Sequence, residues 1–130
     1  MKILKLLSIT VLLLLIASCA TKPKEGVSLI SVESFKTQIT NKNVQLVDVR
    51  TPEEYNEAHI ENAINIDVNG NNFTNEIAKL DKSKPVYIYC RSGGRSANAA
   101  NIMQQEGFKT VNDLDGGFLN WQSKGYQSSK

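Results

Sequence analysis

The 130-residue sequence lacks a strong excess of charge of either sign, with a formal net charge of +2. Its 15 lysines and arginines stand against 13 aspartates and glutamates. They form no basic stripe, so the electrostatic footprint of a nucleic-acid-binding protein is missing. DNA and RNA are therefore not expected among its partners.

Long apolar runs are also scarce, and the only candidate lies at the N-terminus. It covers residues 6–16, follows two lysines and ends in small residues before Cys19. A bilayer-spanning helix needs about 20 apolar residues, so the run is better explained as a secretory signal than as a permanent transmembrane segment. The residues IASC at 16–19 resemble the bacterial lipobox, in which the signal is removed just before a lipid-carrying cysteine. The alternative is an ordinary secreted protein with a free Cys19.

This resemblance implies a signal peptide at 1–18, a lipidated Cys19 that begins a flexible tether at 19–26, and one domain at 27–130. The 112 residues that remain after cleavage suit one compact domain, which we expect to be a monomer. We expect it in the bacterial cell envelope, attached to a membrane only by lipid and facing the periplasm or the exterior. Ala20 replaces the aspartate of an inner-membrane retention signal, which favours the outer membrane where one exists.

Cysteine is rare as well, with two in the whole chain. If Cys19 is lipidated, Cys90 is the only remaining thiol and no intramolecular disulfide can form. An unpaired thiol outside the inner membrane is exposed to oxidation. Cys90 therefore needs a reason to be there.

Strand-like and helix-like segments alternate along the domain. We expect strands at 27–30, 44–49, 63–66, 86–89 and 110–114, helices over about 32–40, 73–80, 95–106 and 118–124, and a short helix that begins at Pro52. Thr51, Pro52 and Glu54 supply an N-cap, a first-turn proline and a capping box. The alternation predicts an α/β fold with a mainly parallel sheet of about five strands and helices on both faces.

Cys90 follows the expected strand at 86–89 and opens the segment CRSGGRSANAA. Ligands of open α/β sheets bind at the carboxyl ends of strands. Gly93 and Gly94 can adopt positive φ, which turns successive amides inward as an anion nest, and the next helix adds its positive end. Both favour the thiolate, the nucleophilic form, relative to a free thiol with a pKa of about 8.5. The alternative is a structural cysteine that closes a buried strand, and the nearby glycines and arginines favour the reactive interpretation.

Three segments in order resemble the rhodanese-like family of single-domain sulfurtransferases. They are LVDVRTPEEYNEAHIENAINI at 46–66, CRSGGRS at 90–96 and DLDGGFLNW at 113–121, and the likeness extends over nearly all of 27–130. It implies the rhodanese-like fold and a Cys90 thiolate that takes the outer, sulfane sulfur of a small anion such as thiosulfate. The resulting persulfide would yield that sulfur to cyanide or another thiol, possibly on a partner protein. No metal or organic cofactor is implied.

The resemblance also assigns roles around Cys90. Backbone amides would hold the thiolate and then the persulfide in an anion-binding loop formed by Arg91, Ser92, Gly93, Gly94 and Arg95. The two arginine side chains can attract anionic donors by bidentate contact, although Arg91 fits a solvated surface charge equally well. Asp48 and Arg50 match the family's DVR near the loop, and an ion pair that braces the strand end is the favoured interpretation of them.

Two other activities compete with sulfur transfer. Related phosphatases place five residues between cysteine and arginine, whereas four intervene here, so the smaller cup suits a single sulfur atom better than a phosphate. A non-catalytic sulfur-relay or redox-sensing module, in which Cys90 passes its sulfur only to a partner, stays open.

His59 is the only histidine, and it matches the histidine of the family's structural GHIPGA turn. We therefore expect it to be structural and not a catalytic base. Ala58 and Glu61-Asn62 replace the glycine and proline-glycine of that turn. This departure puts the local turn geometry in doubt.

Overall fold

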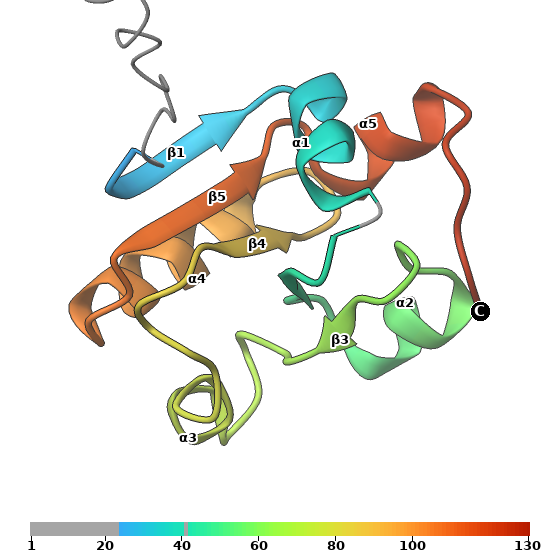
Figure 1. Cartoon of the computed structure of the whole chain (residues 1–130). Coiled ribbons are helices and arrows are strands. Elements are labelled where there is room, and N and C mark those ends of the chain that lie inside the picture. Colours follow the sequence, from blue (N-terminus) through green and yellow to red (C-terminus); the bar gives the residue numbers. More distant parts are fainter. Residues whose placement is uncertain (1–23, 41) are drawn as a thin grey trace, which may run out of the picture.

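Within the part of the chain that the structure describes, five strands alternate with five helices, as the sequence predicts (Figure 1). The computed structural model describes residues 24–40 and 42–130, so the expected signal peptide and Cys19 lie outside the described residues. In chain order the elements are β1 (Gly26–Ile30), α1 (Val32–Ile39), β2 (Gln45–Asp48), α2 (Pro52–Glu57), β3 (Ile64–Asn65), α3 (Phe73–Ile77), β4 (Val86–Tyr89), α4 (Gly94–Gln105), β5 (Thr110–Leu114) and α5 (Gly117–Ser123).

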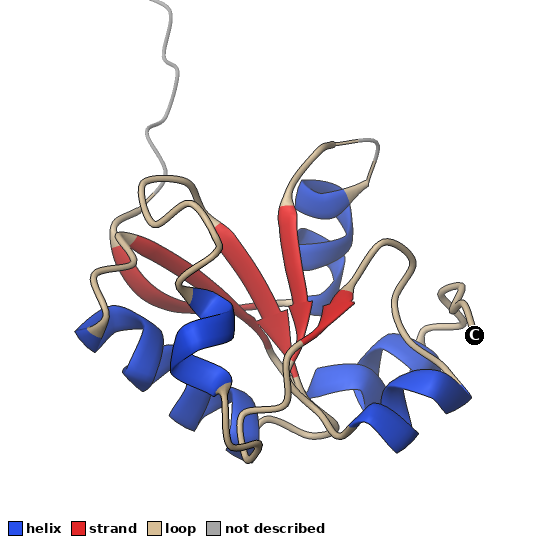
Figure 2. Cartoon of the chain, turned by 90° about the horizontal axis from the view of Figure 1, so that it is seen from below, coloured by secondary structure: helices blue, strands red, loops and turns tan. Residues whose placement is uncertain are grey.

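The strands form one sheet in the order β1-β5-β4-β2-β3, and every neighbouring pair is parallel. The central strand β4 is buried along its whole length. Asp48 of β2 pairs with Tyr89 of β4, and Ile88 of β4 pairs with Asp113 of β5. This register brings the carboxyl ends of three strands together, and the strand arrowheads in Figure 2 point to that same end.

Helices cover both faces of the sheet, which confirms the predicted layers. On one face, α3 and α4 pack on alternate residues of the strands. On the other, α1, α2 and α5 pack on the residues between them (Figure 1). The first core includes Phe73, Ile77, Ala99, Met103, Ile88, Val111 and Cys90, and the second includes Phe35, Leu46, Tyr89, Leu114 and Trp121.

Local capping explains where the helices begin. The Thr51 hydroxyl accepts the Glu54 N–H at 3.2 Å, and the Glu54 carboxylate returns to the Thr51 N–H, so the predicted capping box is present. Helices α4 and α5 begin one residue earlier than expected, because Gly93 and Gly116 serve as N-caps with φ of 123° and 76°. Helix α3 ends at Ile77, short of the expected Leu80.

The altered turn after α2 keeps a sharp bend. Asn62, in place of the family's glycine, has a φ of 69°, and the Ala63 N–H donates to the Ile60 carbonyl at 3.0 Å. Asparagine tolerates this left-handed region better than other non-glycine residues. The departure from the family pattern therefore leaves a closed turn.

Within the described residues, no helix combines the length and the apolar character needed to cross a membrane.

Candidate active site

The Cys90 side chain lies directly after β4, beneath its own loop, and the residue is 1% exposed. The Gly93 N–H donates to Sγ at 3.0 Å, and Sγ lies 3.4 Å from the Ser96 hydroxyl oxygen. That hydroxyl also donates to the Gly93 carbonyl at 3.2 Å. The sulfur therefore accepts a hydrogen bond from a backbone amide and, as a thiol, donates one to the hydroxyl oxygen of Ser96.

The loop has the shape of an anion nest around the sulfur. Gly93 takes a φ of 123°, whereas Gly94 begins α4 without a positive φ, so one glycine provides the turn for which the sequence offered two. The amides of Arg91, Ser92, Gly94 and Arg95 donate to no acceptor in the part of the chain that the structure describes. Unpaired amides beside the positive end of α4 are suited to holding an anion.

The first residues of α5 hydrogen-bond to the backbone at the start of the Cys90 loop. The Phe118 N–H donates to the Cys90 carbonyl at 2.8 Å, and the Leu119 N–H donates to the Arg91 carbonyl at 3.0 Å. Gly117, with a φ of 61°, comes so close that a Cβ there would lie 2.5 Å from the Arg91 oxygen. The motif DLDGGFLNW therefore carries a residue that positions the loop, although the sequence indicated only a strand break at this point.

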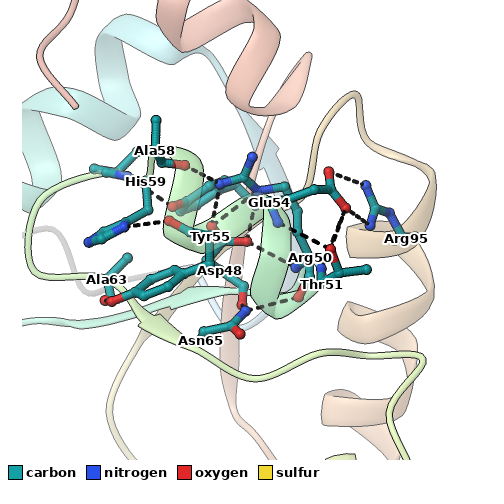
Figure 3. Close-up of polar contacts among 12 residues, drawn as sticks. Asp48, Arg50, Thr51, Glu54, Tyr55, Ala58, His59, Ala63, Asn65 and Arg95 are labelled. Carbon is teal, nitrogen blue, oxygen red and sulfur yellow. Dashed lines mark hydrogen bonds and ion pairs between the residues drawn. The ribbon is translucent and has the colours of Figure 1, made fainter. Parts of the chain in front are cut away.

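Arg95 does not extend over the loop, because its side chain turns toward α2 (Figure 3). It makes a bidentate ion pair with Glu54 at 2.6 and 3.0 Å, which joins the first turn of α4 to α2. Hydrogen bonding from Arg95 lowers the pKa of Glu54 to about 2. Arg91 is exposed. The guanidinium of Arg95 is thus engaged within the protein, and the backbone amides are the loop's free donors.

Asp48 and Arg50 form the buried ion pair that the sequence favoured (Figure 3). Their shortest contact is 2.6 Å, and the same Arg50 nitrogen donates to the Ala58 carbonyl at 2.7 Å. Burial is the largest influence on the pKa of Arg50 and lowers it, but hydrogen bonding to Asp48 and the attraction of nearby negative groups together outweigh burial and raise the pKa of the guanidinium. Arg50 also lies over the Phe118 ring, 4.4 Å from its centroid. The pair therefore braces the end of β2 and the start of α5, whereas the hydrogen-bond partners of Sγ are Gly93 and Ser96.

His59 has a structural place, as expected. Its backbone pairs with Ser129 in both directions, its Nδ1 lies 2.8 Å from the Tyr55 carbonyl, and its ring stacks on that of Tyr55 (Figure 3). None of these contacts reaches the Cys90 loop.

The sequence analysis did not single out two buried polar side chains, Ser96 beside the Cys90 sulfur and Asp113 on β5, in register with Ile88. Ser96 is fully buried and Asp113 is 4% exposed. Oδ1 of Asp113 has no hydrogen-bond partner, while burial raises the pKa of its carboxyl to about 6 against a lowering influence of the Ser96 hydroxyl. The sequence held one signal for Asp113: a carboxylate within the strand expected at 110–114, which the structure shows to be buried along its whole length.

Among residues 24–40 and 42–130, no group of three or more histidine, cysteine, aspartate or glutamate side chains is arranged to hold a metal ion.

Comparison with known proteins assigns a family. Residues 31–124 match the model of the rhodanese-like domain. The chain is 36% identical over 92 residues to the thiosulfate sulfurtransferase GlpE of Shewanella oneidensis, covering 71% of this chain and 89% of that protein. It is 34% identical over 96 residues to the putative sulfur carrier protein YrkF of Bacillus subtilis, where the match covers 73% of this chain but only 51% of the relative.

Solved structures give the same fold. A rhodanese-like domain protein from Staphylococcus aureus aligns with a TM-score of 0.64 at 29% identity, covering 72% of this chain and 90% of that one. The protein SSP1007 from Staphylococcus saprophyticus aligns with a TM-score of 0.66 at 29% identity, covering 77% and 98%. With its five-stranded parallel sheet, five helices and cysteine loop, the chain belongs to the rhodanese-like domain family of sulfurtransferases.

Proposed function

We propose that this protein moves a sulfane sulfur from a small anionic donor, such as thiosulfate, to a thiophilic acceptor through a persulfide on Cys90. The observation that carries the proposal is the Gly93 N–H on Sγ at 3.0 Å, in a loop whose neighbouring amides have no acceptor among the described residues. A relative named as a thiosulfate sulfurtransferase supports the choice of donor.

The chemistry needs no external oxidant or reductant. The Cys90 thiolate attacks the outer sulfur of thiosulfate, the donor's sulfur–sulfur bond breaks, and sulfite leaves with the bonding electrons. Cyanide or a thiolate then attacks the outer sulfur of the persulfide, and the persulfide's sulfur–sulfur bond breaks. The product is thiocyanate or a new persulfide, and the bonding electrons return to Cys90 as its thiolate. The sulfur that the loop must stabilise is anionic before and after loading, which suits fixed amide dipoles.

The loop's dimensions support sulfur over phosphate as the transferred group. Four residues separate Cys90 from Arg95, and the Arg95 guanidinium is held by Glu54. A phosphate needs several donors around its oxygens, whereas a terminal sulfur needs only the amides that surround it. We therefore expect no phosphate release from an aryl phosphate.

The test is thiocyanate formation from thiosulfate and cyanide by the purified domain. We expect Cys90→Ser to reduce the rate to the uncatalysed background, because the serine hydroxyl is not ionised at neutral pH and cannot carry a persulfide. Thiocyanate formation that survives in Cys90→Ser would contradict the assignment. Ser123→Ala, on the last turn of α5, is a control that should retain full activity.

A relay module is the second candidate, favoured by the near-complete burial of Cys90. Intact-mass measurement after thiosulfate treatment separates the two functions. A persulfide that forms but yields its sulfur neither to cyanide nor to small thiols indicates a relay that needs a partner protein, whereas turnover with cyanide indicates the enzyme.

We also propose that the protein is attached to the cell envelope by lipid on Cys19, with the domain facing the periplasm or the exterior. The support is the IASC pattern at 16–19, which lies outside the described residues.

A further inference from the structure

Two apolar side chains lie exposed next to each other on the edge strand β1. Val27 is 43% exposed and Leu29 is 63% exposed, the highest value among the exposed large apolar side chains of the described residues. Alternate residues of a strand point to the same face of the sheet, so these two side chains are neighbours there. Single exposed apolar residues are normal, but an adjacent pair at a sheet edge indicates a contact surface. We refer to Val27 and Leu29 as the β1 patch.

The outer edge of β1 is also open. β1 is the outermost strand of the sheet, beside β5 (Figure 1). The Gly26 N–H donates to the Lys109 carbonyl at 2.7 Å, so the backbone groups of Gly26 face β5. Successive residues of a strand direct these groups to opposite sides, and those of Val27 and Leu29 therefore face away from β5. Whatever covers the patch must accept apolar side chains and also hydrate or pair free backbone groups.

The position of the patch in the chain indicates what lies near it. The described residues begin at 24, directly before β1, and Val27 comes eight positions after Cys19, for which we propose lipid attachment. An extended chain spans at most about 3.5 Å per residue, so Val27 lies within about 28 Å of Cys19. Ile64, another exposed apolar residue, belongs to β3 at the opposite edge of the sheet. The attachment therefore brings the edge that carries the patch to the bilayer.

The charges at the start of β1 suit an anionic surface. Lys24 and Lys109 are exposed, and the hydrogen bond between Gly26 and Lys109 places them at the same end of the strand. Neither lysine takes part in an ion pair among residues 24–40 and 42–130, and Glu25 is the carboxylate of this short segment. Lysines beside a membrane are attracted to anionic lipid headgroups.

A second copy of the chain is the rival occupant, because β1 has neither the charge nor the proline that usually protects an edge strand. A stable protein interface buries about 1,200 Å² or more. One five-residue strand with two exposed apolar side chains offers too little surface for that. A bilayer makes no such demand on the patch, because the lipid on Cys19 already supplies the attachment.

We propose that the β1 patch rests on the membrane surface, with Val27 and Leu29 among the lipid headgroups and Lys24 and Lys109 beside anionic ones. Open sheet edges do not occur within the hydrocarbon region, so the contact is shallow and its backbone groups stay hydrated. The patch orients a domain that lipid holds and does not anchor the domain alone. The inference rests on the proposed lipid attachment.

This orientation leaves the candidate active site in water. β4, which leads into Cys90, is the third strand from the β1 edge, and strands lie about 4.8 Å apart, so the end of β4 is about 10 Å from β1. Leu119 marks the rim of the loop, because its N–H donates to the Arg91 carbonyl at 3.0 Å. Sulfur donors and acceptors therefore reach Cys90 from solution and not from the bilayer.

The test measures the depth of a nitroxide spin label on acylated protein extracted from bacterial membranes and placed in vesicles of equal parts phosphatidylcholine and phosphatidylglycerol. Cys90→Ser is the background, so that Leu29→Cys supplies the only free thiol. Ile64→Cys and Leu119→Cys, at side chains that are 47% and 41% exposed, are the matched controls. Thermal unfolding confirms that each variant is folded.

Oxygen concentrates in lipid, whereas a nickel chelate stays in water. We expect the ratio of oxygen to nickel collisions to be severalfold higher for the label in Leu29→Cys than for either control. In vesicles of phosphatidylcholine alone the ratio in Leu29→Cys should fall, because the lysines lose their anionic partners.

Four results would overturn the proposal. A label in Leu29→Cys as exposed to water as that in Ile64→Cys would remove the contact but leave the lipid attachment standing, since intact mass reports the acyl chains separately. Protein without acyl chains would lose the attachment and the orientation together. Spin–spin broadening in Leu29→Cys that disappears on dilution with unlabelled protein would assign the edge to a second copy. A label in Leu119→Cys that lies in lipid would turn the active site toward the bilayer.

Discussion

Among single residues, Asp113 has the clearest effect on stability. Its ordinary pKa of 3.8 is raised to about 6, so the folded state binds the proton more tightly than the unfolded state does. For a carboxyl with a raised pKa, this stabilisation is present at low pH and is lost as the pH rises from about 4 through 6. The ionised group therefore destabilises the fold at neutral pH.

We predict that Asp113→Asn unfolds at higher urea concentration than wild type at pH 7. The expected gain in the free energy of unfolding is about 2–3 kcal/mol, from a pKa difference of about two. At about pH 3 the two proteins should be equally stable, because both side chains are then neutral. A difference that does not depend on pH would show that the carboxyl is not the cause.

A second single-residue prediction concerns Gly117, which combines a positive φ with a close approach to the backbone of Arg91. In Gly117→Ala the new Cβ would meet the Arg91 carbonyl, so the Cys90 loop must move. We expect a loss of about 3 kcal/mol or more in chemical denaturation, together with slower alkylation of Cys90.

Gly125 is the matched control for that substitution. It has a φ of 71°, but no atom lies within 4 Å of an added Cβ. Gly125→Ala should cost only the strain of the left-handed conformation, about 1–2 kcal/mol, and should leave alkylation unchanged. Equal losses in the two variants would show that the close contact at Gly117 adds nothing.

Between elements, the Glu54–Arg95 ion pair fixes α2 to the first turn of α4. Arg95 lowers the pKa of Glu54 from 4.5 to about 2, so its stabilising effect is complete above about pH 4.5 and is lost as the pH falls toward 2. Both side chains are 27% exposed, so water screens the pair. Its contribution to the free energy of unfolding is therefore close to that of a surface ion pair.

We predict that Glu54→Gln lowers the free energy of unfolding by about 1 kcal/mol at pH 7 and that the loss shrinks to nothing toward pH 2. Urea denaturation across that pH range measures it. Glu53→Gln, on the exposed side of the same helix, should have no comparable effect. A loss in Glu54→Gln that persists at pH 2 would indicate that the glutamine disturbs the capping box instead of the ion pair.

The borders of the elements show how far local signals reach. Thr51 and Pro52 place the start of α2 correctly, because an N-cap and a first-turn proline act within a few residues. The first residues of α4 and α5 were missed by one, since whether a glycine ends a loop or begins a helix depends on the backbone that packs against it.

At the scale of the whole molecule, attachment to the envelope gives a further prediction. Mass spectrometry of protein extracted from bacterial membranes should detect an N-terminal Cys19 with attached acyl chains and no residues 1–18. Two or more chains should hold it at the membrane through a salt wash, since a single chain binds only marginally. Cys19→Ser should abolish both the added mass and the membrane retention, and a full-length chain that retains residues 1–18 would contradict the proposal.

Patterns within short stretches of sequence determined much of this protein. The alternation of strands and helices, the layered parallel sheet and the place of Cys90 before a glycine turn follow from hydrophobic periodicity, capping and turn chemistry. The rhodanese-like resemblance rested on three short motifs, and the match over residues 31–124 confirms it.

Only the tertiary structure decided which side chains meet at the end of the sheet. The strand order sets β5 beside β4, and this brings Asp113 into register with Ile88, two residues before Cys90, while the packing of α2 and α5 engages Arg95 with Glu54 and Arg50 with Phe118. Most of these partners are separated by many positions in the chain, so no local pattern encodes their contacts. They arise because burying two apolar faces of one sheet forces distant segments together.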